Sequence, residues 1–410
     1  VLGMLLSAAE ALAPLDAVLS RQAYLHALEA AATTGGDAVR NVAQAARGAP
    51  APPGPATPAD LLLDGLVTTH TRGYEAGVPA LRRALEACRD DGPTARGDGD
   101  SGWRLLLASR TAATLFEDDL VYALADRQVR LARRTGALAD LPAALLMQSL
   151  TLVLTGELAR AAELAAEGTA IARAIGAVAL PHAELVLAGW RGDQAGAAAI
   201  DATLAREAIE HLDHTVVSVA HYALAVRHNA RCNYGPALTA AARAVETDEL
   251  AYSNVALPEI VEAASRASDP GRAEAAVEEL EMRARATDTP WALGLAARSR
   301  ALITAGPDAE KHYLDALDQL GRQRMVSYSA RTHLVFGEWL RREGRRQEAR
   351  EQLRTAHRLL AGMGAEAFAE RAVRELHATG EHPRRRTAQP TDALTTHELQ
   401  IARLVATGAT

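Results

Sequence analysis

Gly-Glu-Leu-Ala-Arg-Ala-Ala-Glu-Leu-Ala-Ala, residues 156–166, places a turn directly before an alanine-rich stretch of helical character. The apolar residues that follow the turn recur at the spacing of one helix face: Ala161, Leu164, Ala165, Ile171 and Ile175. The same order of turn and alanine-rich helix recurs along the chain, with glycines at positions 192, 235, 271 and 344. The chain is therefore expected to be a succession of short helices.

The spacing of these turns indicates a repeat. Successive glycines lie 36, 43, 36 and 73 residues apart, and Gly306-Pro307 falls in the longest interval as a degenerate unit. Periods near ~34 residues are typical of tetratricopeptide-like helix pairs. Each such pair buries its apolar stripe against its neighbours, which produces a curved superhelix. We find no convincing alternating pattern of a strand, so the sequence predicts an all-α, tetratricopeptide-like helical-repeat superhelix over residues 1–378.

Three segments interrupt the helical pattern. Residues 48–58 contain five prolines, at positions 50, 52, 53, 55 and 58, and residues 90–102 are acidic and glycine-rich. Both are expected to be loops. The third segment, residues 379–393, is expected to be a linker and carries Arg384, Arg385 and Arg386. These arginines favour either a solvated basic linker or non-specific contact with nucleic-acid phosphates.

Composition bounds the function of the chain. It has 410 residues, 49% of them hydrophobic and only 4% aromatic, with a net charge of −7. That charge argues against most of the chain lying along DNA, since phosphate contact needs clustered cations. Cys88 and Cys232 have no metal or disulfide spacing, which fits a reducing cytoplasm. We find no transmembrane or signal pattern, so no membrane partner is expected.

Residues 394–410 have the pattern of a capped helix followed by a turn. Thr395 occupies an N-cap position and Glu398 follows three residues later, as a capping box requires. The helix face and the turn are then formed by Leu394, Ile401, Leu404, Gly408 and Thr410. Together these residues fit Leu-Thr-x-x-Glu-x-x-Ile-x-x-Leu-x-x-x-Gly-x-Thr.

This pattern resembles the opening of a LuxR-type helix-turn-helix. Segments farther back, such as residues 337–342, 363–371 and 59–66, resemble the large ATP-dependent LuxR regulators of actinobacteria. The resemblance covers nearly the whole chain and is loosest from about residue 140 to 320. It implies a transcription regulator whose DNA-reading helices follow Thr410 and whose ATPase module precedes Val1. It therefore implies DNA as a partner, and ATP for that module.

The remaining candidate residues are weaker. Arg227, His228, Arg231 and Tyr234 gather hydrogen-bonding groups on one helix and form either a polar helix face or a groove for a small-molecule or protein effector. His214, His221 and His228 share a face but are about 10 Å apart in steps of seven, too far for one ion. The residues contain no phosphate-binding Gly-x-x-x-x-Gly-Lys-Ser/Thr loop. We therefore expect neither a metal nor a cofactor in this chain.

Two other functions stay open at this point. The chain could be a tetratricopeptide-type scaffold that binds protein partners, which the coding sequence after Thr410 would decide. It could also be an all-α enzyme, which a closed polar pocket with converging groups would favour over an open superhelical groove. We expect a non-enzymatic, cytoplasmic regulator that is able to form homo-oligomers.

Overall fold

The computed structural model describes residues 1–34, 37–90, 101–192, 194–210, 213–246 and 250–381. Throughout these ranges the regular structure is helical, with twenty α-helices and no strand. The prediction of an all-α protein is confirmed. No helix within these ranges is long and apolar enough to cross a membrane.

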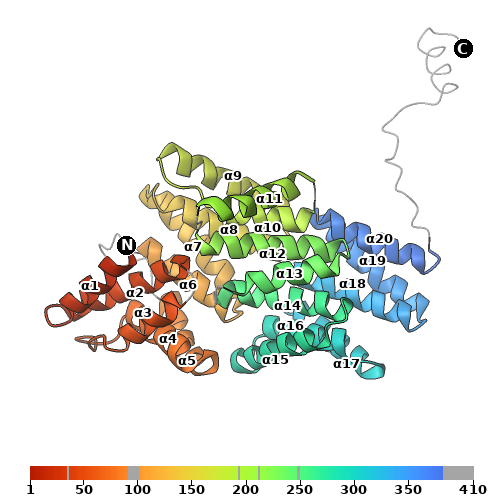
Figure 1. The fold of residues 1–410 in the computed structure, drawn as a ribbon, viewed down its shortest axis with the longest axis horizontal. Helices are drawn as coiled ribbons and strands as arrows, with labels where there is room; N and C mark the ends of the chain where they lie inside the picture. Colours follow the sequence, from red (N-terminus) through yellow and green to blue (C-terminus); the bar gives the residue numbers. More distant parts are fainter. Residues whose placement is uncertain (35–36, 91–100, 193, 211–212, 247–249, 382–410) are drawn as a thin grey trace, which may run out of the picture.

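The helices follow one another closely along the chain (Figure 1). The first seven are α1 Leu2–Leu12, α2 Ala17–Thr34, α3 Ala38–Ala46, α4 Pro58–Arg72, α5 Tyr74–Asp90, α6 Ser101–Thr114 and α7 Asp118–Thr135. The next seven are α8 Leu141–Thr155, α9 Leu158–Ala174, α10 His182–Arg191, α11 Gln194–Glu210, α12 His214–Ala230, α13 Tyr234–Ala244 and α14 Leu250–Arg266. The last six are α15 Pro270–Thr287, α16 Pro290–Ile303, α17 Pro307–Gly321, α18 Val326–Arg342, α19 Arg346–Met363 and α20 Glu366–Ala378.

Most of the packing joins helices that are adjacent in sequence, with the largest contacts between α4 and α5, α18 and α19, and α16 and α17. Other contacts cross long stretches of chain: α15 touches α5, α14 touches α6, α18 touches α8, and α20 touches both α10 and α12. The repeat period did not predict these long-range contacts. They bring the last helices back against the middle of the molecule, where the blue and green parts of the chain meet (Figure 1).

Aromatic side chains fill the space where these helices meet. Trp190 on α10 packs against Tyr328 on α18, with ring centroids 6.4 Å apart. It also packs against Phe368 on α20, with centroids 5.6 Å apart. All three side chains are fully buried. These three aromatic residues therefore pack at contacts between helices that are far apart in the sequence.

The turns differ from the sequence prediction at two positions. Gly156, Gly192 and Gly344 do adopt positive φ at helix ends, as expected of glycine. Gly235 and Gly271, in contrast, lie inside the first turns of α13 and α15. The positive φ of those two turns belongs to Cys232 and Ser268, both at 60°. The glycine-turn prediction is wrong there, because the chain turns before the glycine and the next helix has already begun.

Candidate functional site

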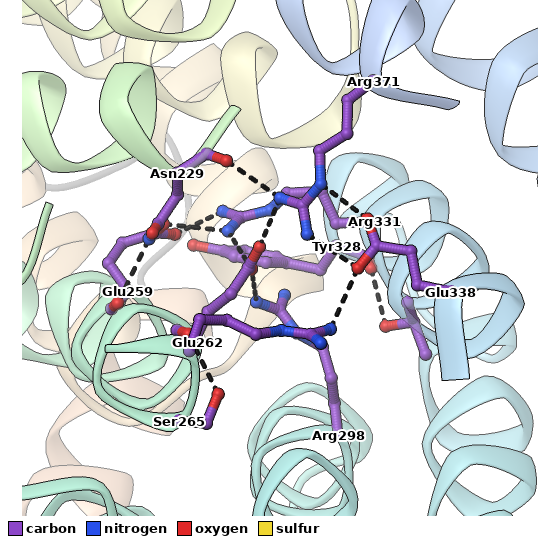
Figure 2. A network of polar contacts seen from close by, with 11 residues as sticks. Asn229, Glu259, Glu262, Ser265, Arg298, Tyr328, Arg331, Glu338 and Arg371 are labelled. Atoms are coloured by element: carbon purple, nitrogen blue, oxygen red, sulfur yellow. Dashed lines mark hydrogen bonds and ion pairs between the residues drawn. The ribbon is translucent and has the colours of Figure 1, made fainter. Parts of the chain in front are cut away.

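A network of buried charged side chains lies where α12, α14, α16, α18 and α20 converge (Figure 2). We call it the ion network, and its members are Asn229, Glu259, Glu262, Arg266, Arg298, Arg331, Glu338 and Arg371. All of them except Arg266 are less than 5% exposed. Helix α14 supplies three members because Glu259, Glu262 and Arg266 are spaced at three and four residues on one face.

Glu262 is the centre of the ion network, since its carboxylate contacts three arginines from three helices. Arg331 and Arg371 each place a guanidinium nitrogen 2.6 Å from it, and Arg298 places one at 3.1 Å. Burial alone would raise the pKa of Glu262, but the charges of Arg331, Arg371 and Arg298 outweigh burial and hold that pKa well below its usual range. Glu262 is therefore ionised at neutral pH.

Each of the other two carboxylates holds one arginine through two hydrogen bonds, and Glu338 also pairs with Arg266 at 2.9 Å. Both carboxylate oxygens of Glu259 accept from Arg331, and Glu259 also accepts from the side-chain amide of Asn229 at 2.8 Å. Glu338 accepts from Arg371 at 2.6 and 2.9 Å. Such bidentate pairs fix the planar guanidinium groups in orientation as well as position.

The charges of the ion network nearly cancel. The described members include three carboxylates and four guanidinium groups, of which Arg266 is the one with partial access to solvent. Burial, together with the like charge of Arg331, lowers the pKa of Arg298 despite its contact with Glu262. Two nitrogens of Arg298, Nε and Nη1, have no hydrogen-bond partner in the described part of the chain. Arg298 is therefore the least compensated member.

The ion network anchors the last described helix to the rest of the molecule. Arg371 on α20 donates to Glu262 on α14, to Glu338 on α18 and, at 2.9 Å, to the backbone carbonyl of Asn229 at the end of α12. The residues that follow α20 are also held in place. Arg350 donates to the Thr379 carbonyl at 2.8 Å, and Arg354 pairs with Glu381. The first residues of the predicted linker 379–393 therefore pack on α19.

The structure places the four predicted groove residues on α12, in the turn that leads into α13 and at the start of α13. Arg227 and His228 are half-buried on α12. Arg231 is exposed and donates to the backbone carbonyl of Gly192 at 2.6 Å. Tyr234 begins α13, and its ring lies 5.9 Å from the guanidinium carbon of Arg371. Arg231 and Tyr234 thus contact the protein itself, and an effector contact by these four residues stays a prediction.

The DNA-related predictions fall on residues 382–410, which lie outside the described residues. They comprise Arg384, Arg385, Arg386, Leu394, Thr395, Glu398, Ile401, Leu404, Gly408 and Thr410. Within the described ranges, no group of three or more His, Cys, Asp or Glu side chains is placed to hold a metal ion.

A second buried polar group involves His182 at the start of α10. Thr215 donates its hydroxyl to Asp213 at 2.7 Å, so its oxygen accepts from Nε2 of His182, 3.3 Å away. That assignment leaves Nδ1 of His182 to accept from the Tyr252 hydroxyl, also at 3.3 Å. Burial lowers the pKa of His182 to about 4, with Asp213 opposing the shift and Arg110 adding to it. The ring is therefore neutral at pH 7.

We expect the stability of the protein to fall between pH 7 and pH 5 because of His182. The unfolded chain takes up a proton near pH 6.5, whereas the folded chain resists protonation until about pH 4, so acid favours the unfolded state. The loss from this one group is about 2 kcal/mol between pH 7 and pH 5. Urea unfolding at both pH values should give a smaller loss for His182→Gln than for the wild type. The exposed His214→Gln should lose as much stability between pH 7 and pH 5 as the wild type. If His182→Gln also loses as much as the wild type, the assignment to His182 is refuted.

No family model matches the chain, and the search of curated proteins finds no match. The case for a function therefore rests on the residues themselves.

Sequence reasoning missed the ion network. Its one visible signal is Glu259 and Glu262 inside Val255-Ala-Leu-Pro-Glu-Ile-Val-Glu-Ala-Ala264, an otherwise apolar run. Carboxylates in such a run are either on an exposed edge or buried with partners. The arginine partners lie up to 109 residues away in sequence, so spacing gives no way to choose between these alternatives.

Proposed function

We propose that this chain is the sensor or assembly arm of a DNA-binding transcription regulator of the LuxR type. The observation that carries the proposal is the pattern of Leu394, Thr395, Glu398, Gly408 and Thr410, which matches the opening of a LuxR-type helix-turn-helix. The ion network gives a physical connection between the arm and the segment that carries this pattern. Helix α20 is the last described helix before this pattern, and Arg371 fastens it to α12, α14 and α18.

The finer architecture belongs to the same proposal. We infer that the helices form one tetratricopeptide-like superhelix, wound tightly enough that α20 returns to α10 and α12. Such an arm transmits a signal if its packed helices have two arrangements and if binding at one end favours one arrangement over the other. An effector, ATP bound to an upstream module, or a second copy of the chain would then act by binding one arrangement more tightly than the other. In this proposal the arm works in the cytoplasm and performs no chemistry of its own.

The test of this function is binding to DNA. The reading frame should continue past Thr410 through two further helices, and protein that includes them should bind promoter DNA at least ~1000-fold more tightly than unrelated DNA. Residues 1–410 alone should show at most weak binding through Arg384–Arg386 that fades with added salt. Fluorescence anisotropy with labelled promoter fragments at two salt concentrations measures both.

Gly408→Val in the longer protein provides the matched variant. Gly408 is expected to end the helix with φ > 0, where a β-branched residue is strained, so the helices that follow should lose their register. Promoter binding should disappear while circular dichroism stays that of the wild type. Unchanged affinity would remove the turn assignment. Tight, sequence-discriminating binding by residues 1–410 would place the DNA-binding surface elsewhere, and a frame without a recognition helix would favour a scaffold.

A further inference from the structure

The last two described helices, α19 and α20, lie at one end of the molecule (Figure 1). Helix α19 packs mainly on α18 and α20. Beside its buried face, arginines recur at every fourth position, so they follow one another along one side of the helix. We call them the arginine stripe, and its members are Arg346, Arg350, Arg354 and Arg358. Three of the four are exposed, and Arg350 is half-buried.

Two members of the arginine stripe hold the residues that follow α20. Arg354 pairs with Glu381 at 2.8 Å, and Arg350 donates to the backbone carbonyl of Thr379, also at 2.8 Å. Arg384–Arg386 follow Glu381 by three to five residues in the sequence. Each residue adds at most ~3.6 Å to the reach of a chain, so the last of these arginines stays within about 18 Å of Glu381. Connectivity alone therefore brings a second basic group to this end of the molecule.

The other two members, Arg346 and Arg358, form no ion pair within the described ranges. Two carboxylates belong to the same helix. Glu348 pairs outside the arginine stripe, and Glu351 offsets part of its charge. Glu381 offsets another part from the residues after α20. Arg346 and Arg358 are thus exposed guanidinium groups that an anion in solution is able to reach.

Charge is distributed unevenly along the chain. Residues 341–410 contain 13 arginines and nine acidic residues, whereas residues 1–340 contain 31 basic and 42 acidic residues. The net charge of −7 therefore combines a positive C-terminal part with a strongly negative remainder. A polyanion would be attracted to the end that carries the arginine stripe and repelled by the rest of the molecule.

We propose that the arginine stripe binds the phosphate backbone of nucleic acid without reading its sequence. Four residues of helix advance ~6 Å, so the stripe spans about 18 Å, the axial length of about five phosphates of one DNA strand. Arginine suits this contact because its planar guanidinium donates to phosphate oxygens in pairs. The choice of nucleic acid rests on the proposed function, since the LuxR-type pattern follows this surface in the sequence. The stripe would position the molecule on DNA while other helices read the bases.

Binding of residues 1–410 to a labelled DNA duplex of unrelated sequence tests the proposal. Fluorescence anisotropy at several salt concentrations should give a Kd on the order of 10 µM at about 50 mM salt. The logarithm of the affinity should fall linearly with the logarithm of the salt concentration, because each phosphate contact releases counterions. Poly-L-glutamate at equal charge concentration should compete at least about tenfold more weakly than unlabelled DNA, because its charges are less dense.

Variants assign the binding to the arginine stripe. Arg346→Gln with Arg358→Gln should reduce the salt slope by about 2, at ~0.9 for each lost phosphate contact, and weaken binding about tenfold or more. Arg346→Lys with Arg358→Lys keeps both charges and should retain most of the slope. The matched control, Arg134→Gln with Arg173→Gln, removes two exposed arginines from α7 and α9 that form no ion pair within the described ranges. It should behave as the wild type, and circular dichroism verifies that each variant is folded.

Three results would overturn the proposal. The first is no binding to the duplex at low salt, and the second is an unchanged salt slope in the double glutamine variant. The third is competition by poly-L-glutamate as strong as that by DNA, which would make the arginine stripe a surface for acidic proteins. The proposed regulator is tested separately, by promoter discrimination in the longer protein. Loss of that discrimination with the salt dependence of the stripe intact would refute the regulator alone, and the reverse would refute the stripe alone.

Discussion

Glu262→Gln should lower the free energy of unfolding by about 3–5 kcal/mol, the cost of breaking a buried ion pair from one side. The substitution keeps the shape of the side chain but removes the charge that faces Arg298, Arg331 and Arg371. Four guanidinium groups would then share two carboxylates. Chemical denaturation followed by circular dichroism measures the loss, and the midpoint should move while the slope stays constant.

Two variants make this result specific. Glu348→Gln removes an exposed carboxylate that pairs with Arg345, and it should leave the unfolding midpoint unchanged. The double variant Glu262→Met with Arg298→Met removes one charge of each sign from the ion network and should be more stable than Glu262→Gln. A loss below about 1 kcal/mol in Glu262→Gln would mean that solvent reaches the ion network.

The folded-state pKa values of both Glu262 and His182 are lowered, but for different reasons: burial lowers that of His182, whereas the charges of neighbouring arginines lower that of Glu262 despite burial. Because the arginines lower the folded pKa of Glu262, its contribution to stability is present above the unfolded value near pH 4.5. It is lost as the pH falls below that value toward the depressed folded pKa. His182 acts earlier, between pH 6.5 and pH 4. The two groups therefore contribute to the loss of stability in acid over different pH ranges, and the variants His182→Gln and Glu262→Gln each remove one contribution.

The helices were predictable because their signals are local. Apolar spacing such as Ala161, Leu164 and Ala165 reports one helix face without knowledge of the rest of the chain. Helix starts were local as well: Thr57 accepts from the amide of Asp60, which bonds back in a capping box. The turns at Cys232 and Ser268 escaped prediction because left-handed conformations at such residues are set by tertiary packing rather than by preference.

The ion network was not predictable for the opposite reason. Arg371 resembles any surface arginine of an amphipathic helix, and only the return of α20 to α12 and α14 makes it buried. A repeat period predicts contacts between neighbouring helices and says nothing of how tightly the whole chain winds. The groove hypothesis for Arg231 and Tyr234 rested on their polarity, and the structure gives those two side chains partners within the protein.

Because α20 packs against α10, we expect a second large loss of stability on substitution of Gly192, the C-cap of α10. Gly192 has φ +70°, and a Cβ there would lie 2.5 Å from the Cβ of Ala367 on α20. Gly136 caps α7 with nearly the same φ, +68°, but a Cβ there would meet nothing within 4 Å. Comparing alanine at the two positions therefore separates the cost of backbone strain from the cost of steric overlap with α20. Gly136→Ala should cost about 1–2 kcal/mol from strain alone, and Gly192→Ala about 2–4 kcal/mol, because overpacking adds to the strain.

A double-variant cycle assigns the difference to one contact. Ala367→Gly removes the Cβ that a new side chain at position 192 would strike, so Gly192→Ala should be less damaging when Ala367 is already glycine. We expect a coupling free energy of about 1 kcal/mol or more from urea unfolding of the four proteins. The control cycle of Gly136→Ala with Ala367→Gly should be additive, because Gly136 has open space around it. If Gly192→Ala and Ala367→Gly were also additive, Ala367 would not lie in contact with position 192 in solution.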